Sequence, residues 1–484
     1  MIQYDVVVIG AGVVGCAAAR ELSRYRLKIC VLEKELDVAL GNSSRNTGML
    51  HAGFTYRLGT LKAVCAVEGN REFDRVAEEL AVPFKRTGKV VVGFTDTDRN
   101  NILKFKTIGE ENGVDGLEMI DKNRLYDIEP EALGNFALFS PMSGILDSMQ
   151  YTIALAENAA QNGVEFRFGA EVTTIEKITD GYRITAGQQV IASRWLVNCA
   201  GMYSTKISDL LGITGYETKG FKGEYYVLDK KAGKGLHVPV YPAPNEKGGF
   251  STHATITIDG NVLVGPDSYL TEGREDYTTT RAHLEGLVRD GLKMFDQVKP
   301  EYFIRSFAGI RWKLVHPETG EIQDFVLECR KEAPGAINLV GIESPGLTCA
   351  LPLARRIVDK IKEAETLDAN SLFNPVRKGI TRFSELSLAE KRDLIRRQPD
   401  YGEIICRCES VTRAEIRQAI HNPLGVLTVT GIKNRTRATM GRCQGSYCET
   451  RITAMIAEDM NIKETKIRYH KKGSYLFTGK VRGE

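Results

Sequence analysis

Four cysteines near the C-terminus stand in two close pairs, and paired thiolates are typical ligands of metals. One residue separates Cys406 from Cys408, and four residues separate Cys443 from Cys448. Four thiolates satisfy a 2Fe-2S cluster, and nearby arginines can offset its negative charge. Four thiolates also bind zinc, although C-x-C is a less usual zinc spacing. The pattern therefore favours a 2Fe-2S cluster, with structural zinc as the alternative.

The opposite end of the chain carries a glycine pattern that is typical of dinucleotide sites. A continuous apolar run at residues 4–9 reads as a strand buried on both faces. Gly10-Ala-Gly12-Val-Val-Gly15 follows, then an alanine-rich helical segment and a second strand that ends at Glu33. The first glycine permits a tight turn, the second lets the backbone approach a pyrophosphate, and the third lets helix and strand pack closely. Glu33 suits ribose hydroxyls and disfavours the 2′-phosphate of NADP.

Two further segments favour FAD over NAD. Residues 195–201 form an apolar strand that ends in Ala-Gly, similar to the second FAD motif of flavoproteins. Residues 341–348 open a helix after a buried strand at 336–340 and resemble the segment that faces the flavin pyrimidine edge. A second GxGxxG motif is absent from the sequence, which argues against a two-nucleotide disulfide reductase. The predicted FAD contacts are Gly10, Gly12, Gly15, Glu33, Ser43, Ser44, Asn46, Thr47, Gly48, Val172, Ala200, Gly201, Gly341, Gly346, Leu347 and Thr348.

A histidine and an arginine have the chemistry that oxidation of an anionic alcohol requires. Removing the hydroxyl proton while a hydride leaves needs a base that titrates near neutrality, and an anionic substrate needs a cation. His51 and Arg311 are suitable residue types. A lone histidine is more often structural, so the residues alone leave this assignment open.

The chain from Met1 to about Ile361 resembles the FAD-dependent glycerol-3-phosphate oxidase and L-2-hydroxyglutarate oxidase group of the D-amino-acid-oxidase-like superfamily. The motifs that carry this resemblance are Asn46-x-Gly48, His51-x-Gly53, Gly59-x-Leu61-Lys62-Ala63, Gly223-Glu224-Tyr225, Val264-Gly265-Pro266 and Gly309-Ile-Arg311. The resemblance implies that His51 is the base beside the flavin and that Arg311 binds the substrate anion. Further predicted substrate contacts are Lys222, Tyr225 and His253, of which Lys222 could equally be a solvated surface lysine.

Residues 401–449 resemble the bacterioferritin-associated-ferredoxin-like 2Fe-2S domain at the end of the large subunit of anaerobic glycerol-3-phosphate dehydrogenases. The segments that carry this resemblance are residues 405–412 and 435–448. The resemblance implies Cys406, Cys408, Cys443 and Cys448 as the cluster ligands. The oxidase group lacks such a domain, so we expect electrons to leave to a partner flavoprotein or a quinone-reducing subunit rather than mainly to oxygen.

These segments predict an α/β protein with a Rossmann-like FAD-binding domain, an antiparallel-sheet substrate domain and a small α-helical C-terminal 2Fe-2S domain. The predicted FAD-binding parts are residues 1–80, 145–215 and 330–365, and the predicted substrate domain is residues 81–144 and 216–329. A linker at 366–400, the cluster domain at 401–455 and a basic extension at 456–484 complete the predicted division. Capping boxes at Ser387-x-x-Glu390 and Thr412-x-x-Glu415 predict the starts of two helices.

Composition restricts the function classes. The chain has 484 residues, ten cysteines and a net charge of +3, and from Tyr401 onward 15 Lys/Arg stand against 8 Asp/Glu. No basic stripe with interleaved aromatic residues accompanies this excess, so nucleic-acid binding is not expected. No apolar run approaches the roughly 18 residues of a membrane span. We expect a cytoplasmic oligomer that is able to associate peripherally with the inner face of the cell membrane.

The sequence therefore predicts an FAD-dependent dehydrogenase of a small anionic hydroxy compound. The first candidate substrate is sn-glycerol 3-phosphate and the second is L-2-hydroxyglutarate. Electrons would pass from FAD through the cluster to a partner. A different class stays open, namely an electron-transfer subunit of a larger flavoprotein complex that oxidises no substrate itself, as does a zinc-stapled docking domain at the C-terminus.

Overall fold

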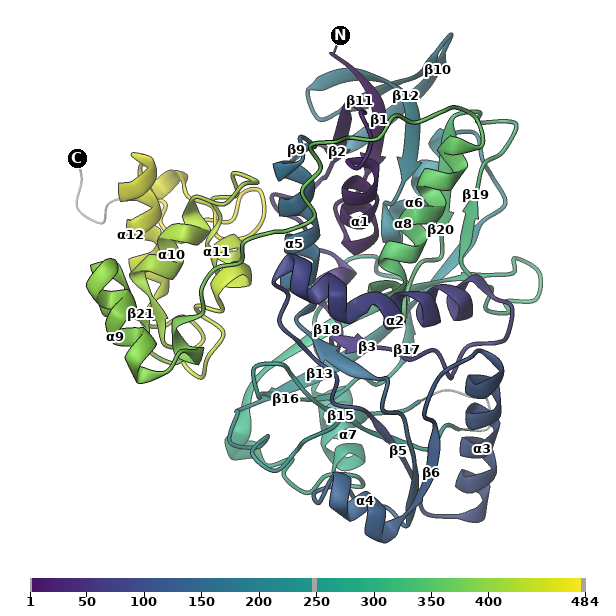
Figure 1. Cartoon of the computed structure of the whole chain (residues 1–484), viewed down its shortest axis with the longest axis vertical. Helices are drawn as coiled ribbons and strands as arrows, with labels where there is room; N and C mark the ends of the chain where they lie inside the picture. Colours follow the sequence, from purple (N-terminus) through teal and green to yellow (C-terminus); the bar gives the residue numbers. More distant parts are fainter. Residues whose placement is uncertain (1, 246–249, 480–484) are drawn as a thin grey trace.

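The computed structural model describes residues 2–245 and 250–479 and has three parts, which can be told apart in Figure 1. Two are built on sheets and lie one above the other in that view. The third is a small helical module, formed by residues after about 383, that lies beside them.

The first sheet has parallel strands at its centre. Strand β1 (Ile2–Ile9) pairs in parallel with β2 (Ile29–Leu32) and β12 (Gln189–Asn198), and the predicted strands at 4–9, 28–32 and 336–340 are present. The remaining strands are β9 (Glu165–Arg167), β10 (Val172–Ile178), β11 (Gly181–Ala186), β19 (Val326–Glu328) and β20 (Ala336–Val340).

Both faces of this sheet are covered, which explains the continuous apolar run of β1. Val6 and Val8 belong to a core with the helices α1 (Val13–Leu22), α5 (Ser148–Gln161) and α8 (Gly346–Lys362). Val7 and Ile9 face the opposite core, next to α6 (Ser204–Leu210). Because side chains alternate along a strand, a strand with two buried faces must be apolar at every position.

The second sheet is antiparallel apart from one parallel pair, β5 with β14. Its longest pair, β13 with β18, stays paired from Glu217 to Leu228. Its strands are β5 (Val90–Gly93), β6 (Glu118–Asp121), β7 (Phe136–Phe139), β13 (Glu217–Leu228), β14 (Val240–Pro242), β15 (His253–Ile256), β16 (Val262–Gly265), β17 (Tyr269–Thr271) and β18 (Phe303–Val315). The accompanying helices are α3 (Asp96–Glu111), α4 (Lys122–Ile128) and α7 (Arg281–Gly291).

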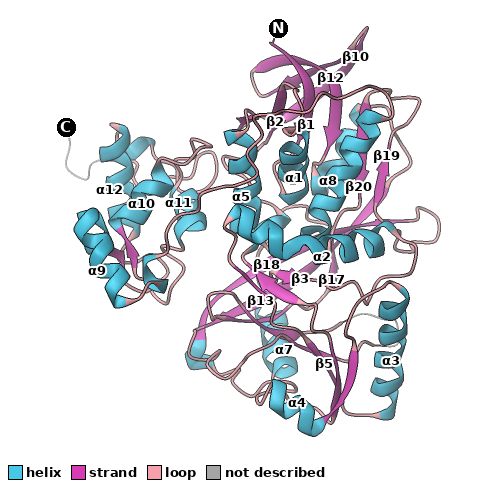
Figure 2. Ribbon diagram, in the orientation of Figure 1, coloured by secondary structure: helices cyan, strands magenta, loops and turns pink. Residues whose placement is uncertain are grey.

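A small sheet and a long helix join these two parts (Figure 2). The small sheet contains β3 (Met49–Leu50), β4 (Phe84–Lys85) and β8 (Gly144–Leu146). The long helix, α2 (Leu61–Leu80), crosses α8 closely at Gly69. A Cβ atom at Gly69 would lie only 1.9 Å from the Thr348 carbonyl oxygen, so a larger residue would not fit there. Pro352 in α8 has no N–H to bond this carbonyl. The helix starts at Gly346, within the segment 341–348 that the sequence predicts to open it.

The C-terminal module consists of four helices and a two-stranded hairpin. These elements are α9 (Leu388–Arg397), β21 (Ile404–Cys406), β22 (Val411–Thr412), α10 (Arg413–Ile420), α11 (Val429–Thr436) and α12 (Glu449–Met460). Both predicted capping boxes are present, at Ser387 with Glu390 and at Thr412 with Glu415. The predicted extension at 456–484 begins inside α12, and residues 480–484 lie outside the described residues.

A buried ionic network holds this module against the part built on the first sheet. The Arg435 side chain is 1% exposed and bonds Asp37 at 2.7 Å and Glu157 at 3.3 Å. Arg377, in the segment that precedes the module, bonds Glu157 at 2.6 Å. Buried charges are strongly destabilising when one partner is removed. These ion pairs therefore give the module a defined docking position against α5.

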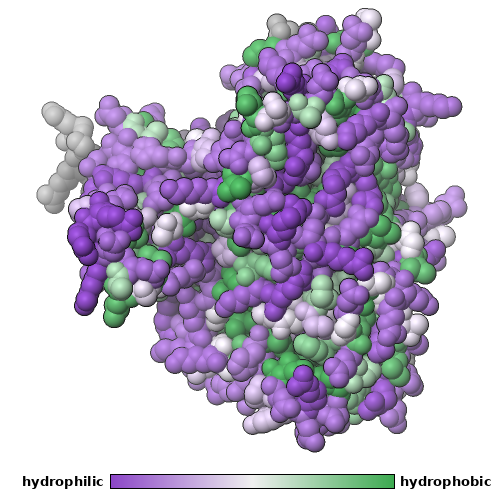
Figure 3. Space-filling view, in the orientation of Figure 1, coloured by the Kyte–Doolittle hydropathy of each residue, from purple (hydrophilic) through white to green (hydrophobic). Residues whose placement is uncertain are grey.

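The surface visible in Figure 3 is mostly hydrophilic, with hydrophobic residues in scattered spots. Within residues 2–245 and 250–479, no helix is both long and apolar enough to cross a membrane.

Candidate functional site

A cavity of about 520 Å³ extends from the glycine-rich loop to His51. Both large sheets contribute residues to it, and so does the C-terminal module. The cavity therefore combines a region suited to a dinucleotide with a region that carries titratable side chains.

The glycine-rich loop has the geometry that the sequence predicts. Gly10 has a φ of +101°, and a Cβ atom there would lie 2.5 Å from the Cys199 carbonyl oxygen. A Cβ atom at Gly15 would lie 1.9 Å from the Gly10 carbonyl oxygen. A side chain at either position would clash with neighbouring backbone atoms. The loop therefore needs glycine at both positions and exposes its backbone to the cavity. Glu33 accepts a hydrogen bond of 2.7 Å from the Ala11 N–H and lines the same cavity.

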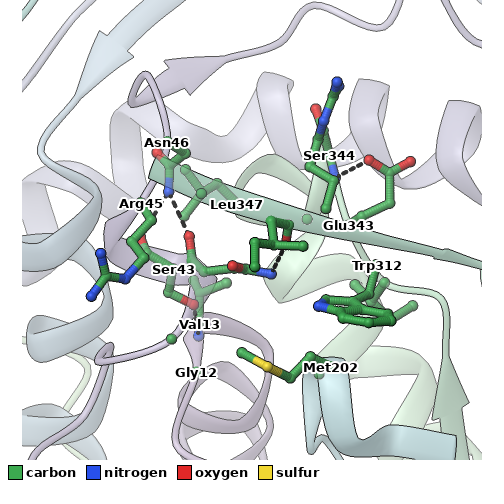
Figure 4. Close-up of a pocket in the computed structure, with 18 of the residues that line it drawn as sticks. Gly12, Val13, Ser43, Arg45, Asn46, Met202, Trp312, Glu343, Ser344 and Leu347 are labelled. Carbon is green, nitrogen blue, oxygen red and sulfur yellow. Dashed lines mark hydrogen bonds between the residues drawn. The ribbon is translucent and has the colours of Figure 1, made fainter. Parts of the chain in front are cut away.

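The segment 41–48 closes over the start of α1, as Figure 4 shows. The Ser43 hydroxyl accepts a hydrogen bond of 2.9 Å from the Val13 N–H. The Asn46 amide donates to the Ser43 carbonyl at 2.9 Å, and its oxygen accepts from the Gly48 N–H at 2.8 Å. These bonds fix the segment against a helix N-terminus, which favours anionic groups.

The predicted FAD contacts divide into those that line the cavity and those that shape it. The residues that line it are Gly10, Gly12, Glu33, Ser43, Asn46, Thr47, Ala200, Gly201, Gly346 and Leu347. The residues that lie outside the lining are Gly15, Ser44, Gly48, Val172, Gly341 and Thr348. Thr348 acts indirectly, because its hydroxyl accepts a hydrogen bond of 3.1 Å from the His51 N–H.

His51 lies in the cavity between two fixed backbone contacts. Its N–H bonds Thr348, and its carbonyl oxygen accepts a hydrogen bond of 3.0 Å from the Asn70 amide. Burial, followed by the nearby charges of Lys89, His253 and Arg311, lowers the pKa of His51 to about 3. The imidazole is therefore neutral at physiological pH and has an unprotonated nitrogen, but its pKa lies below the near-neutral value predicted for the base.

His253 also lines the cavity, stacked on the Tyr241 ring at 3.8 Å between ring centres. Its Nδ1 lies 3.2 Å from the Ser251 carbonyl oxygen, whereas its buried Nε2 has no hydrogen-bond partner within the described part of the chain. A carbonyl only accepts, so Nδ1 carries the proton and Nε2 presents a lone pair. Burial lowers the pKa of His253 to about 3, so it stays neutral.

Three cations and one carboxylate gather at the same cavity. Lys62 bonds Glu343 at 2.5 Å, and Arg311 and Lys313 project from alternate positions of β18. Burial opposes ionisation of Glu343, but Lys62, Arg311 and Lys313 outweigh it and lower the pKa of this carboxyl. The group therefore keeps an excess of positive charge that suits an anion.

Of the other predicted substrate contacts, Tyr225 lines the cavity and Lys222 does not. The Lys222 side chain is 2% exposed and bonds Asp276 at 2.9 Å. Positions 222 and 225 have opposite parity on β13, so their side chains leave the sheet on opposite faces. The prediction that Lys222 binds substrate is not supported by this position.

Several cavity residues were not among the predicted contacts. Lys62 belongs to the motif Gly59-x-Leu61-Lys62-Ala63, and Lys313 follows Arg311 by two positions on the same strand. The sequence therefore contained patterns from which both contacts could have been predicted. Tyr241 and Lys471 line the cavity from segments without any such signal.

The four cysteines of the C-terminal module come together as two pairs. Hydrogen bonds join Cys406 to Cys448 and Cys408 to Cys443, and the Thr439 N–H points at both sulfurs of the first pair. The bond from Cys448 is the main cause that lowers the pKa of the Cys406 thiol to about 6. Two cysteine pairs with backbone donors fit a cluster with two irons.

Across residues 2–245 and 250–479, no group of three or more His, Cys, Asp or Glu side chains is arranged to hold a metal ion. Cys406 and Cys448 are buried, whereas Cys408 is exposed. A Cβ atom at Gly441 would lie 2.2 Å from the Cys408 Cβ, so the loop that carries Cys443 packs tightly on Cys408.

Comparison with known proteins places both halves of the chain. Residues 5–360 match the family described as FAD dependent oxidoreductase, and residues 404–458 match the BFD-like 2Fe-2S binding domain. The chain therefore belongs to the FAD-dependent oxidoreductase family and has a C-terminal 2Fe-2S domain. These matches confirm the predicted resemblance, the fold class and the two cofactors, and they favour the cluster over zinc.

Individual relatives are consistent with this family. A glycerol 3-phosphate dehydrogenase of Caloramator mitchellensis is 38% identical over the whole of both chains. A mitochondrial L-2-hydroxyglutarate dehydrogenase of Nematostella vectensis is 27% identical and covers 75% of this chain and 92% of its own. The FAD-bound L-alpha-glycerophosphate oxidase of Mycoplasma pneumoniae superposes with a TM-score of 0.73 at 26% identity, covering 78% of this chain and 99% of that one.

Proposed function

We propose that this protein is a dehydrogenase that oxidises sn-glycerol 3-phosphate to dihydroxyacetone phosphate. The single observation that carries this proposal is the joint presence, in one cavity, of neutral His51 and the cationic group of Lys62, Arg311 and Lys313. A relative that is 38% identical over its whole length carries the name of this activity.

His51 is the proposed base for the hydroxyl at C2. When bound, FAD supplies the acceptor of the hydride from C2, and the 2Fe-2S cluster supplies a one-electron path outward. The neutral imidazole of His51 takes the hydroxyl proton, so the C2–H bond and the O–H bond break as the C=O bond forms. The fixed backbone of His51, held by Thr348 and Asn70, keeps the ring in position.

Arg311, Lys313 and Lys62 are the proposed phosphate contacts. A phosphate monoester carries close to two negative charges at neutral pH, and three cations beside one carboxylate leave a matching excess. Among the described residues, Arg311 makes one long hydrogen bond, 3.4 Å to the Ser268 hydroxyl, so its guanidinium has further donors for the substrate.

His253 favours glycerol 3-phosphate over L-2-hydroxyglutarate. Its Nε2 is a buried acceptor that lines the cavity. A hydroxyl group, such as the one at C1 of glycerol 3-phosphate, can donate to it. A second carboxylate has no proton to donate and would face a lone pair. The hydroxyglutarate branch therefore stays the second candidate, supported by relatives that match only the FAD-binding part.

The proposed route for electrons leaves through the exposed edge of the cysteine module to a protein partner, either a flavoprotein or a quinone-reducing subunit. Cys408 is exposed. Beside it, the Arg407 guanidinium lies 4.3 Å from the centre of the Tyr447 ring, and Tyr447 is 41% exposed. Exposed aromatic and arginine side chains are common anchors of protein interfaces, and their charge suits an acidic partner. Oligomerisation and contact with the membrane surface are further parts of this proposal.

Anaerobic stopped-flow reduction of the flavin tests the substrate. We expect glycerol 3-phosphate to bleach the flavin absorption faster than L-2-hydroxyglutarate, and glycerol, which lacks the phosphate, to fail at the same concentration. Faster bleaching by L-2-hydroxyglutarate would move the assignment to the second candidate. No bleaching by either compound would favour an electron-transfer subunit without its own substrate.

A further inference from the structure

A hairpin at the C-terminal end of the described chain reaches the cavity of the FAD-binding part. Residues 468–475 form this C-terminal hairpin, with a bridge between Arg468 and Tyr475 and a hydrogen bond of 2.7 Å from the Tyr469 N–H to the Ser474 carbonyl. Lys471, at its turn, lines the cavity together with the glycine-rich loop.

The C-terminal hairpin is firmly attached to the cysteine module. The Thr430 N–H at the start of α11 donates to the Tyr469 carbonyl at 2.9 Å. The Tyr469 hydroxyl donates to Glu449 of α12 at 2.5 Å, and Ile467 is buried in the core of the module. The position of Lys471 therefore follows from the docking of the module.

Lys471 meets two other parts of the chain at the edge of the cavity. Its Nζ lies 3.9 Å from a carboxylate oxygen of Glu275, in the loop after β17. The same carboxylate forms an ion pair with Lys34 and accepts a hydrogen bond of 2.8 Å from the Tyr203 hydroxyl. Lys34, Glu275 and Lys471 are each between 30% and 47% exposed at their side chains, so the group lies where the cavity meets solvent.

The location of this group identifies the end of the dinucleotide that it faces. Lys34 directly follows Glu33, the predicted ribose contact, and Tyr203 follows the Ala-Gly turn after β12. Lys34, Tyr203, Glu275 and Lys471 all line the cavity. Lys34 also pairs with Glu35 at 3.2 Å, so two lysines face two carboxylates, and Lys471, at 3.9 Å from Glu275, is the more weakly paired cation. A weakly paired ammonium group suits the diphosphate and not the uncharged isoalloxazine ring.

The neighbouring wall is also electropositive. Arg45 lines the cavity with its guanidinium 3.9 Å from the Tyr277 ring centre, and its buried Nε has no hydrogen-bond partner within the described residues. Burial, followed by the charges of Arg45 and Lys471, lowers the pKa of His470 in the C-terminal hairpin. Arg45 adds a third cation to this region, against the carboxylates of Glu35 and Glu275.

We propose that the C-terminal hairpin is part of the FAD site and that Lys471 is a cationic contact to the adenosine-diphosphate half of the dinucleotide. The inference goes beyond the proposed function, because it concerns retention of FAD whatever the substrate is. It also couples two events: FAD that touches the hairpin stabilises the docked cysteine module, and the docked module in turn strengthens FAD binding by the same free energy.

Titration of the full-length apoprotein with FAD tests the contact, with quenching of FAD fluorescence as the readout. Loss of one partly exposed charge contact is worth about 1 kcal/mol, so Lys471→Ala should weaken FAD binding about fivefold. Lys471→Glu should weaken it further, and Lys471→Arg should restore it. The matched controls are Lys472→Ala and Lys472→Glu, because the adjacent Lys472 is exposed and does not line the cavity.

Hydrogen exchange of the unaltered protein tests the hairpin itself and needs no variant to fold. We expect the amides of residues 468–475 to exchange more slowly with FAD bound than without it. Equal FAD affinity of the Lys471→Glu and Lys472→Glu variants would overturn the Lys471 contact. Identical exchange with and without FAD would overturn the hairpin's part in the site. Neither outcome bears on which alcohol reduces the flavin.

Discussion

The FAD cavity and the cysteine module differ in how they are assembled and in how they meet solvent. The cavity takes residues from both large sheets and from the C-terminal hairpin, and His253 in it is only 6% exposed. The module takes its four thiols from residues 406–448, and Cys408 is exposed. Proton and hydride removal benefits from a site that excludes water, whereas delivery of electrons to a partner needs an accessible edge. The two regions therefore separate substrate chemistry from electron exit.

Removing one cysteine should break the second region and spare the first. We expect Cys408→Ala to abolish the electron paramagnetic resonance signal of the reduced 2Fe-2S cluster, because one iron loses a thiolate. Flavin reduction by substrate should continue at the parental rate. Cys329→Ala, at an exposed cysteine outside the module, is the control. A retained cluster signal in Cys408→Ala would contradict the ligand assignment.

Removing the proposed base, His51, should impair the FAD cavity and leave the cysteine module intact. His51→Asn should slow flavin reduction by glycerol 3-phosphate by about 10²- to 10⁴-fold, the usual contribution of a general base. Chemical reduction of the cluster should be unaffected. Stopped-flow absorbance measures the first quantity, and His237→Asn, at a side chain that is 61% exposed, is the matched control. A rate within twofold of the parent would exclude His51 as the base.

Breaking the ionic network of Arg435 should weaken docking of the cysteine module. Arg435→Met leaves the buried carboxylates of Asp37 and Glu157 with less compensation, which costs about 3–5 kcal/mol. Hydrogen exchange of the α11 amides should rise accordingly. Arg396→Met on the exposed face of α9 should leave exchange unchanged. Unaltered α11 exchange in Arg435→Met would mean that other contacts hold the module.

Within the cavity, the phosphate contact should be separable from the chemistry. Lys313→Met should raise KM for glycerol 3-phosphate about tenfold, with a smaller change in kcat, since loss of a bond to a charged group costs roughly 1.5–3 kcal/mol before solvent screening. Lys331→Met, at an exposed lysine, is the control. An unchanged KM with a large fall in kcat would instead place Lys313 at the reacting centre.

The smallest expected effect concerns pH. Burial, with Lys89 as the next cause, lowers the pKa of His51, so this base stays unprotonated well below the ordinary value for histidine. The acid limb of kcat/KM should therefore lie below pH 6.5. Lys89→Met should raise the pKa of His51 and move the acid limb to higher pH by a fraction of a unit. Ionisation of the substrate phosphate is common to both proteins, so the difference between their profiles isolates His51. A shift to lower pH would contradict the role of Lys89.

Local patterns were sufficient for the elements whose residues are adjacent in the chain. The glycine-rich loop, the strands at 4–9 and 336–340 and both capping boxes follow from spacing and are present. Each of these depends mainly on residues close together in the chain. The four cysteines instead come together across their two sequence pairs, Cys406 with Cys448 and Cys408 with Cys443. Lys222 lies outside the cavity lining, because the parity of a strand fixes which residues share a face, while the pocket's side of the sheet depends on the packing of both domains.

The sequence by itself thus determined that a dinucleotide site and a four-cysteine module occupy one chain, because backbone geometry and ligand chemistry leave characteristic residues. Only the tertiary structure decided how the two meet. Arg435 forms an ion pair with Asp37, and Lys471 lines the same cavity as Gly10, although the members of each pair lie far apart in the sequence. Such contacts join residues hundreds of positions apart, and no local periodicity records them. They form because a buried charge without a partner is strongly destabilising, so each buried cation must be packed beside a carboxylate.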